Sequence, residues 1–238
     1  FAIRQRACYS MIEIQIKQFI ESLNIEVEHS NWDIIENKEI DLYIPTKNIG
    51  IEVDGLYWHS YNPDKGPKNE DRYKHLNKTI DAGKSNVDLI HITDYEWRFK
   101  NDLVKSLLLT KLGKATKIVA RKCQLRAVSP SEEREFLTKN HFQGYIASKY
   151  AIGLYFNNEL VSIMTIGSSR FDKDSKYELL RFCNKLNNVV VGGANKLFLN
   201  ILSYIDNEQI ISYCDISKFN GKIYEILGFT KVDRKSVV

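Results

Sequence analysis

The chain has 238 residues, of which 43% are hydrophobic and 27% are charged, and its formal net charge is +4. This composition is typical of a globular protein, and no apolar run approaches the roughly 18 residues that a membrane-spanning helix needs. The chain has no signal-peptide pattern, so neither a membrane nor a secreted protein is indicated, and we expect a cytoplasmic protein. Its four cysteines are scattered and form no C-x-x-C pair, which indicates neither a zinc ribbon nor a disulfide framework, and we expect reduced thiols.

The charge is unevenly divided along the chain, which favours two domains. Residues 1–115 carry 16 Lys and Arg against 18 Asp and Glu, whereas residues 116–238 carry 18 against 12. The basic surplus in the second half is compatible with contacts to DNA phosphates, and equally with an ordinary basic domain. The chain begins at Phe1 rather than at methionine, which is compatible with a complete chain and with a fragment of a longer protein.

The first predicted elements are an amphipathic helix and a β-hairpin. Isoleucine, phenylalanine and leucine recur with helical spacing over residues 8–23, with Glu13 beside the apolar stripe, and a short strand is expected at 25–28. Residues 39–54 alternate with the period of a strand on both sides of a turn at 45–48. If Ile44 faces Ile49, the same register makes Asp41 and Glu52 cross-strand neighbours.

The hairpin brings three acids to one polar face: Asp41, Glu52 and Asp54. Like charges placed opposite each other destabilise a sheet, so a tight cluster needs a cation, and oxygen-only ligands suit Mg²⁺. The alternative is a solvated sheet face that binds no metal. His59 follows where a loop over this face is expected to begin.

A polar helix is expected from about Glu70 to Gly83, then a buried strand at 87–92 and a helix near 98–112. Asp71, His75 and Lys78 lie at i, i+4 and i+7, on one face of the polar helix. Such a face is commonly solvated. Beside a carboxylate-bound metal, however, His or Lys can orient or deprotonate a water.

The second half, residues 116–238, reads as an α+β domain with a central antiparallel sheet. Its expected strands are 122–128, 150–156, 160–167, 177–182, 210–213 and 229–232, and its expected helices are 129–140, 192–205 and 218–227.

Residues 8–112 resemble the very-short-patch-repair-like endonucleases, particularly the phage homing endonucleases named for an E-D-x-H-D motif. Glu13, Asp41 and His59 match the leading acid, the strand aspartate and the histidine of that motif, with Asp54 and Asp71 as further matches. The resemblance implies a restriction-endonuclease-like α/β core, a mixed sheet flanked by helices, that hydrolyses double-stranded DNA with Mg²⁺.

The resemblance also implies roles for individual residues. Asp41 would hold the metal, to which the hairpin adds Glu52 and Asp54 as further candidate ligands. His59 would act as general base on the attacking water or stabilise the departing oxygen, and Glu13 would position His59 or a metal-bound water. The related superfamily commonly has a Lys two residues after its second acid, where this chain has Asp54, and Lys78 is a further catalytic candidate. The candidates for contact with DNA are Tyr57, Trp58, Lys74 and His75, although Tyr57 and Trp58 would equally pack beneath the loop.

The second half resembles the GNAT-like domain of phage proteins, including the Mom-type DNA modification enzymes. The resemblance is carried by residues 136–144, 178–182, 191–197, 212–215 and 224–229. It implies a possible second site at Arg181, Gly192, Gly193, Asp215 and Tyr224, with acetyl-CoA as its cofactor. The complete R/Q-x-x-G-x-G/A loop of acyl-CoA binding is absent.

Three functions therefore follow from the sequence. The first is a Mg²⁺-dependent homing endonuclease of a phage or bacterial cell. The second is a transferase that modifies a DNA base through the second half, and the third is an inactive DNA-binding module.

Overall fold

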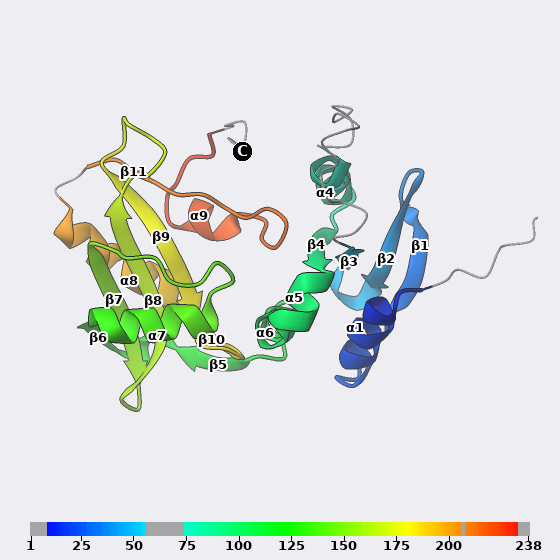
Figure 1. Ribbon diagram of the computed structural model, residues 1–238, viewed down its shortest axis with the longest axis horizontal. Coiled ribbons are helices and arrows are strands. Elements are labelled where there is room, and N and C mark those ends of the chain that lie inside the picture. The colour runs from blue at the N-terminus through cyan, green and yellow to red at the C-terminus, as the bar shows by residue number, and fades with distance from the viewer. Residues whose placement is uncertain (1–8, 56–73, 206–207, 233–238) are drawn as a thin grey trace, which may run out of the picture. The chain divides into compact units, whose positions relative to one another are not determined.

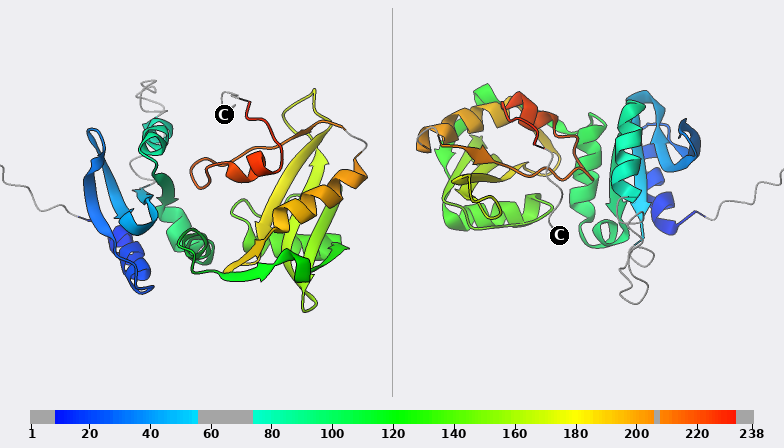
Figure 2. Two further views of the ribbon diagram at one scale, coloured as in Figure 1. Left: turned by 180° about the vertical axis from the view of Figure 1, so that it is seen from behind. Right: turned by 90° about the horizontal axis from the view of Figure 1, so that it is seen from above.

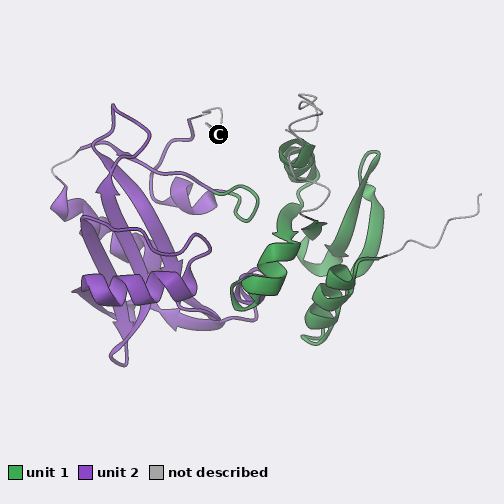
Figure 3. Cartoon of the chain, viewed as in Figure 1, with its two compact units in different colours: residues 1–104, 215–220 green, residues 105–214, 221–238 purple. Residues whose placement is uncertain are grey.

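The computed structural model describes residues 9–55, 74–205 and 208–232. The chain divides into two compact units (Figures 1 and 3): unit 1 comprises residues 1–104 and 215–220, and unit 2 comprises residues 105–214 and 221–238. The division falls about ten residues before the boundary expected near residue 115. It also assigns residues 215–220, which the sequence placed in the second half, to unit 1.

Unit 1 is a four-stranded mixed sheet with helices packed against it. The sheet has the order β1-β2-β3-β4, antiparallel except for the parallel pair β3 and β4. Its elements are α1 (Met11–Glu21), β1 (Glu28–Ile35), β2 (Lys38–Ile44), η1 (Pro45–Lys47), β3 (Ile49–Asp54), α4 (Lys74–Lys84), β4 (Asp88–Thr93), α5 (Asp94–Phe99) and α6 (Asn101–Lys111), the last of which crosses the division between the units. A mixed α/β architecture agrees with the expectation from sequence.

Local sequence explains how these elements begin and turn. Ser10 caps α1 and forms a reciprocal capping box with Glu13, while Ile16 and Ile20 are fully buried. The turn between β2 and β3 ends at Asn48, whose φ of 51° is left-handed, a conformation that asparagine tolerates better than most residues. The helix expected near 98–112 is two helices, because Thr93 starts α5 directly after β4 with a second capping box.

Residues 215–220 join unit 1 along the free edge of β4. The Ser217 carbonyl accepts a hydrogen bond from the His91 backbone N–H at 2.8 Å, and the Lys218 ammonium donates to the His91 carbonyl at 2.7 Å. Lys218 also forms an ion pair with Glu96 at 3.1 Å, and it is 4% exposed. An edge strand with unpaired backbone groups is thereby covered by a segment distant in sequence.

Unit 2 is built on a five-stranded sheet in the order β11-β9-β8-β7-β6, with a separate parallel pair of β10 and β5 (Figure 2). Strand β11 is parallel to β9, and the other pairs of this sheet are antiparallel. Its strands are β5 (Thr116–Val119), β6 (Gln124–Ala127), β7 (Tyr150–Phe156), β8 (Glu159–Ser168), β9 (Tyr177–Asn184), β10 (Asn188–Val191) and β11 (Ile210–Ile211). Its helices are η3 (Ala120–Lys122), α7 (Pro130–Asn140), α8 (Gly193–Ile201), η4 (Leu202–Tyr204) and α9 (Lys222–Ile226).

Two apolar clusters hold unit 2 together, one on each face of the sheet. Phe136 and Leu137 of α7 pack with Ile163, whereas Leu197 of α8 packs in the cluster that contains Met164. Successive residues of a strand point to opposite faces, so α7 and α8 cover opposite sides of β8. This agrees with the expected α+β class for this half.

Several expectations for the second half are wrong in detail. Residues 229–232 have no regular structure, and α9 is shorter than the helix expected at 218–227, because 215–220 contacts β4 instead. Strands β5 and β10 were not expected, because each is only four residues long. Within the described residues, no helix is long and apolar enough to cross a membrane, and Cys123, Cys183 and Cys214 are free thiols.

Candidate active site

The hairpin of β2 and β3 has the register that the sequence predicts. Ile44 lies opposite Ile49, and the same register continued along the strands brings Asp41 level with Glu52. The Asp41 carboxylate accepts a hydrogen bond from the Val53 backbone N–H at 2.8 Å. This bond fixes the Asp41 side chain against the end of β3, beside Glu52.

Asp41, which is half-buried, and Glu52, which is buried, form a carboxylate pair in which two negative charges repel each other. Glu52 is 6% exposed, and burial, reinforced by the charge of Asp41, raises its pKa to about 7. Burial also raises the pKa of Asp41, and the charge of Glu13 acts in the same direction. Burial and a neighbouring like charge both disfavour the ionised form of an acid. A cation bound between the two carboxylates would relieve both effects.

Lys78 of α4 contacts this pair from the adjoining helix. Its ammonium donates a hydrogen bond to Glu52 Oε2, and its charge lowers the pKa of both Glu52 and Asp41. The second carboxylate oxygen, Glu52 Oε1, is buried and has no hydrogen-bond partner among the described residues. Leaving a buried acceptor unsatisfied costs about 1–3 kcal/mol, more when it is charged, so this oxygen is available to a hard cation.

Glu13 is held next to the pair by the first turn of α1. One of its oxygens accepts from the Ser10 backbone N–H at 3.2 Å, and the other lies 3.3 Å from His29 Nε2. The His29 ring stacks on Tyr9 with 3.6 Å between ring centroids. Glu13 therefore adds a third carboxylate, which affects Asp41 through its charge.

A second group of side chains lies along the same face of β3. Asp54 Oδ1 is 3.3 Å from His75 Nδ1 of α4, and Asp54 Oδ2 is 3.0 Å from His91 Nδ1 of β4. Ligand atoms of these three residues all lie within 4.8 Å of one another, a spacing that fits a metal ion. Thr79 Oγ1 lies 2.9 Å from His91 Nε2.

The structure thus brings together most of the candidates that it describes in unit 1. Lys78 and His75 both project from α4 toward β3, whereas Lys74, the first residue of that helix, is exposed. The remaining candidates of the first half lie outside the described residues: His59, Tyr57, Trp58 and Asp71. Their roles stay predictions.

Three side chains of this site were not among the candidates predicted from the sequence: His91, Thr79 and His29. His91 lies within the apolar run Val87–Ile92, where a polar residue in a buried strand is itself a signal. Thr79 follows His75 by four residues and therefore shares its helix face. His29 carries no comparable signal, because nothing in its neighbourhood points to Glu13.

In unit 2, the contacts of Arg181 are those of a structural residue. Its Nε donates to the Gly144 carbonyl at 3.1 Å and its Nη1 to the Leu180 carbonyl at 2.8 Å, and burial lowers its pKa. Tyr224 donates to the Tyr213 carbonyl at 3.4 Å, and burial raises its pKa. Participation of either residue in a transferase site stays a prediction.

The other second-site candidates also have structural roles. Gly192 caps α8 with a φ of 76°, which favours glycine, and Gly193 is the first residue of that helix. Asp215 belongs to unit 1, where its carboxylate accepts from the Ser217 backbone N–H at 3.1 Å and from the Ser217 hydroxyl at 2.6 Å. Binding of acetyl-CoA at these residues stays a prediction.

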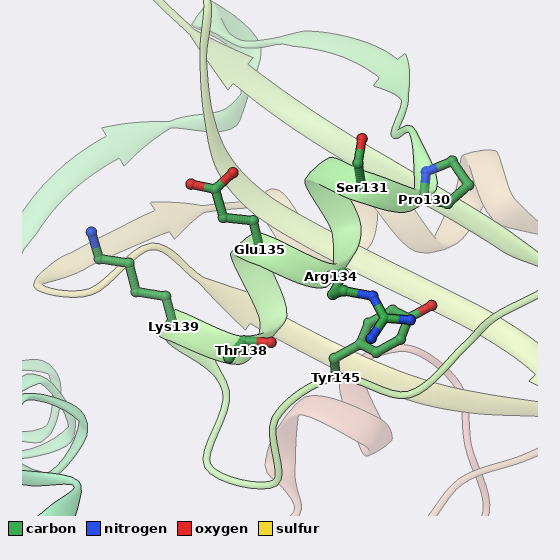
Figure 4. Close-up of a pocket in the computed structure, with 7 residues that line it drawn as sticks. All are labelled: Pro130, Ser131, Arg134, Glu135, Thr138, Lys139 and Tyr145. Carbon is green, nitrogen blue, oxygen red and sulfur yellow. The ribbon is translucent and has the colours of Figure 1, made fainter.

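An open hollow of about 620 Å³ lies along α7 in unit 2 (Figure 4). The Arg134 guanidinium lies over the Tyr145 ring, 4.3 Å from its centroid. The residues that line the hollow are Pro130, Ser131, Arg134, Glu135, Thr138, Lys139 and Tyr145. This lining contains neither a carboxylate pair nor a histidine, whereas the Asp54, His75 and His91 group, whose spacing fits a metal ion, lies in unit 1.

Three comparisons with known proteins give one match, to a solved structure. No protein-family model matches the chain, and no curated protein matches it. A solved structure that does match is the "Homing Endonuclease I-Bth0305I Catalytic Domain", at 22% sequence identity and a TM-score of 0.34, covering 44% of this chain and 96% of that chain. A TM-score of this size carries no argument about function, which is therefore inferred from the side chains of unit 1.

Proposed function

We propose that unit 1 is a divalent-metal-dependent endonuclease of the homing type, which hydrolyses phosphodiester bonds in double-stranded DNA. The observation that carries the proposal is the carboxylate pair of half-buried Asp41 and buried Glu52, with the Lys78 ammonium hydrogen-bonded to Glu52. Such a pair is costly to the fold unless a cation compensates it, and phosphoryl transfer is a reaction for which bound cations are effective catalysts. The sequence resemblance, in which Glu13 and Asp41 are motif residues, supports the choice of DNA.

The donor set at this pair fits Mg²⁺. Mg²⁺ prefers oxygen ligands and is commonly held by one or two carboxylates, with water and phosphate oxygens in the remaining positions. Asp41 and Glu52 supply those carboxylates, and Glu52 Oε1 is the buried oxygen that lacks a partner among the described residues. When bound, the ion would polarise a phosphoryl oxygen and lower the pKa of an attacking water.

Lys78 would supply the ammonium that the chain lacks at position 54. The related superfamily commonly places this Lys on the strand, two residues after the second acid, whereas here Lys78 reaches Glu52 from α4. At this location the ammonium would hold Glu52 ionised, ready to bind a cation, and would stabilise negative charge that develops on a phosphate. Glu13 would hold a water or a proton beside Asp41.

The test is nicking of supercoiled plasmid DNA with Mg²⁺ or Mn²⁺, using the full chain. Asp41→Ala should abolish nicking, whereas Glu36→Ala, which removes an exposed carboxylate from the turn between β1 and β2, should not. Nicking that persists unchanged in Asp41→Ala would overturn the mechanism. DNA binding without cleavage under either metal would instead favour the inactive DNA-binding module. The transferase alternative for unit 2 stays a prediction.

A further inference from the structure

The carboxylate of Asp54 lies between two histidines, one on each neighbouring element. It faces His75 Nδ1 from α4 at 3.3 Å and His91 Nδ1 from β4 at 3.0 Å. The two imidazole rings meet edge to face, with 5.3 Å between centroids. His91 is 4% exposed, so its imidazole ring is surrounded by protein atoms rather than by water.

Thr79 contacts the His91 ring nitrogen that faces away from Asp54. Its Oγ1 lies 2.9 Å from His91 Nε2 and 3.0 Å from the His75 carbonyl oxygen. The other ring nitrogen, His91 Nδ1, lies 3.0 Å from Asp54 Oδ2. An ion bound between His91 and Asp54 would take Nδ1 as its ligand and leave the Nε2–H group to donate to Thr79.

We propose that Asp54, His75 and His91 bind a first-row transition-metal ion such as Zn²⁺, separately from the Asp41–Glu52 pair. Two ligands of a tetrahedral ion with bonds of about 2.0–2.1 Å lie roughly 3.3 Å apart, close to the observed separations of 3.0 and 3.3 Å. A metal-bound histidine typically donates its other ring N–H to a protein acceptor, and Thr79 Oγ1 lies 2.9 Å from His91 Nε2, where it can accept this hydrogen bond. Three protein ligands leave a position open to water or to a phosphate oxygen.

The chemistry of the two sites separates them. The Asp41–Glu52 pair offers oxygen atoms alone and suits Mg²⁺, whereas two imidazole nitrogens with one carboxylate favour a softer ion such as Zn²⁺. The His75 side chain is 38% exposed, which gives an ion a path from solvent. The nitrogen-containing site follows from geometry and does not depend on the proposed nuclease activity.

Titration of the metal-free full chain with Co²⁺, followed by visible absorption, tests the site directly. Co²⁺ takes the place of Zn²⁺ and is spectroscopically visible. We expect one equivalent to bind with a low-coordinate cobalt spectrum and to be displaced by Zn²⁺. His75→Ala should abolish the spectrum, whereas His141→Ala, which removes a histidine of unit 2, should leave it unchanged. Asp41→Asn should also retain it, because Asp41 belongs to the other site.

Thr79 provides a second test in variants that keep all three ligands. Thr79→Val removes the hydroxyl that hydrogen-bonds to His91 Nε2 and should weaken Co²⁺ binding about 10- to 100-fold, whereas Thr79→Ser should restore it. A wild-type chain that binds neither Co²⁺ nor Zn²⁺ would overturn the proposal. A spectrum lost in Asp41→Asn but kept in His75→Ala would overturn it as well, because the ion would then lie at the carboxylate pair.

Discussion

Lys78 and Glu52 lie 26 residues apart in the chain and form a buried ion pair between α4 and β3, with side chains 15% and 8% exposed. Removing one partner of such a pair leaves an uncompensated charge in the interior, which is far more costly than losing a surface ion pair. The ammonium offsets one carboxylate, while Asp41 and Glu52 together carry two. One negative charge therefore remains available to a divalent cation at the same location.

Lys78→Met should lower the nicking rate about 10²- to 10³-fold, the usual cost of removing a single charge-stabilising donor. It should also raise the pKa of Glu52 further, because the Lys78 charge lowers it in the native protein. Plasmid nicking and ¹³C NMR of the Glu52 carboxyl measure the two effects. Lys84→Met is the matched control, since Lys84 is on the same helix but 72% exposed. Nicking at the native rate in Lys78→Met would exclude a role for this ammonium.

Metal-free protein should lose stability as pH rises through the titration of Glu52. The pKa of Glu52 is about 7 in the folded chain against 4.5 for an unperturbed glutamate, so the folded state binds more protons between these values. The unfolding free energy therefore falls over this range, by at most about 1.4 kcal/mol per pH unit and roughly 3 kcal/mol in total. The contribution is fully present below pH 4.5 and is lost above pH 7.

Urea denaturation at several pH values with a chelator present measures this fall, and Glu52→Gln is the control that isolates it. The difference between the native chain and Glu52→Gln should narrow as pH drops toward 4.5. Excess Mg²⁺ should reduce the fall, because a ligand that binds the ionised folded state stabilises it. Equal pH dependence in both proteins would contradict the raised pKa of Glu52.

The contrast between the hairpin and the helix shows how much of this site the sequence could predict. Strict alternation over 39–54 predicted which residues of both strands share a face, and the observed pairing of Ile44 with Ile49 is the register from which the Asp41 and Glu52 pairing was predicted. Helical spacing placed His75 and Lys78 on one face, but spacing along a helix does not say what that face contacts. Only the three-dimensional fold shows α4 against Glu52 and Asp54.

Tertiary contacts also explain what the sequence could not predict. His91 occupies a strand whose other central residues are apolar, and its partners come from α4 and β3. Residues 215–220 follow the unit 2 segment 105–214 and still form a backbone hydrogen bond with β4, a contact that local patterns cannot encode. Short strands such as β5 and β10 depend on each other for their hydrogen bonds, so neither is visible from its own four residues.

Glu13→Gln should separate the electrostatic role of Glu13 from its role as a helix cap. Glutamine can still complete the capping box with Ser10, so the unfolding free energy should change by less than about 0.5 kcal/mol. Nicking should fall, and the pKa of Asp41 should drop, because the Glu13 charge raises it. Ser10→Ala is the converse variant, which should cost about 1 kcal/mol by denaturation and leave nicking intact. Equal nicking by Glu13→Gln and the native chain would assign Glu13 to capping alone.

Lys218→Met should destabilise unit 1, although Lys218 lies far along the chain. The ammonium is buried against Glu96 and the His91 carbonyl, and its loss leaves the Glu96 carboxylate without that partner, at a cost of about 3 kcal/mol. Hydrogen exchange should increase at 215–220 and along β4, as followed by mass spectrometry. Adding Glu96→Gln, which keeps the capping box of α5, should recover part of the lost stability.

The control for Lys218→Met is Lys231→Met, an exposed site where the substitution is expected to change stability by less than about 0.5 kcal/mol. A loss below about 1 kcal/mol in Lys218→Met, with unchanged exchange in β4, would show that this segment is dispensable for unit 1.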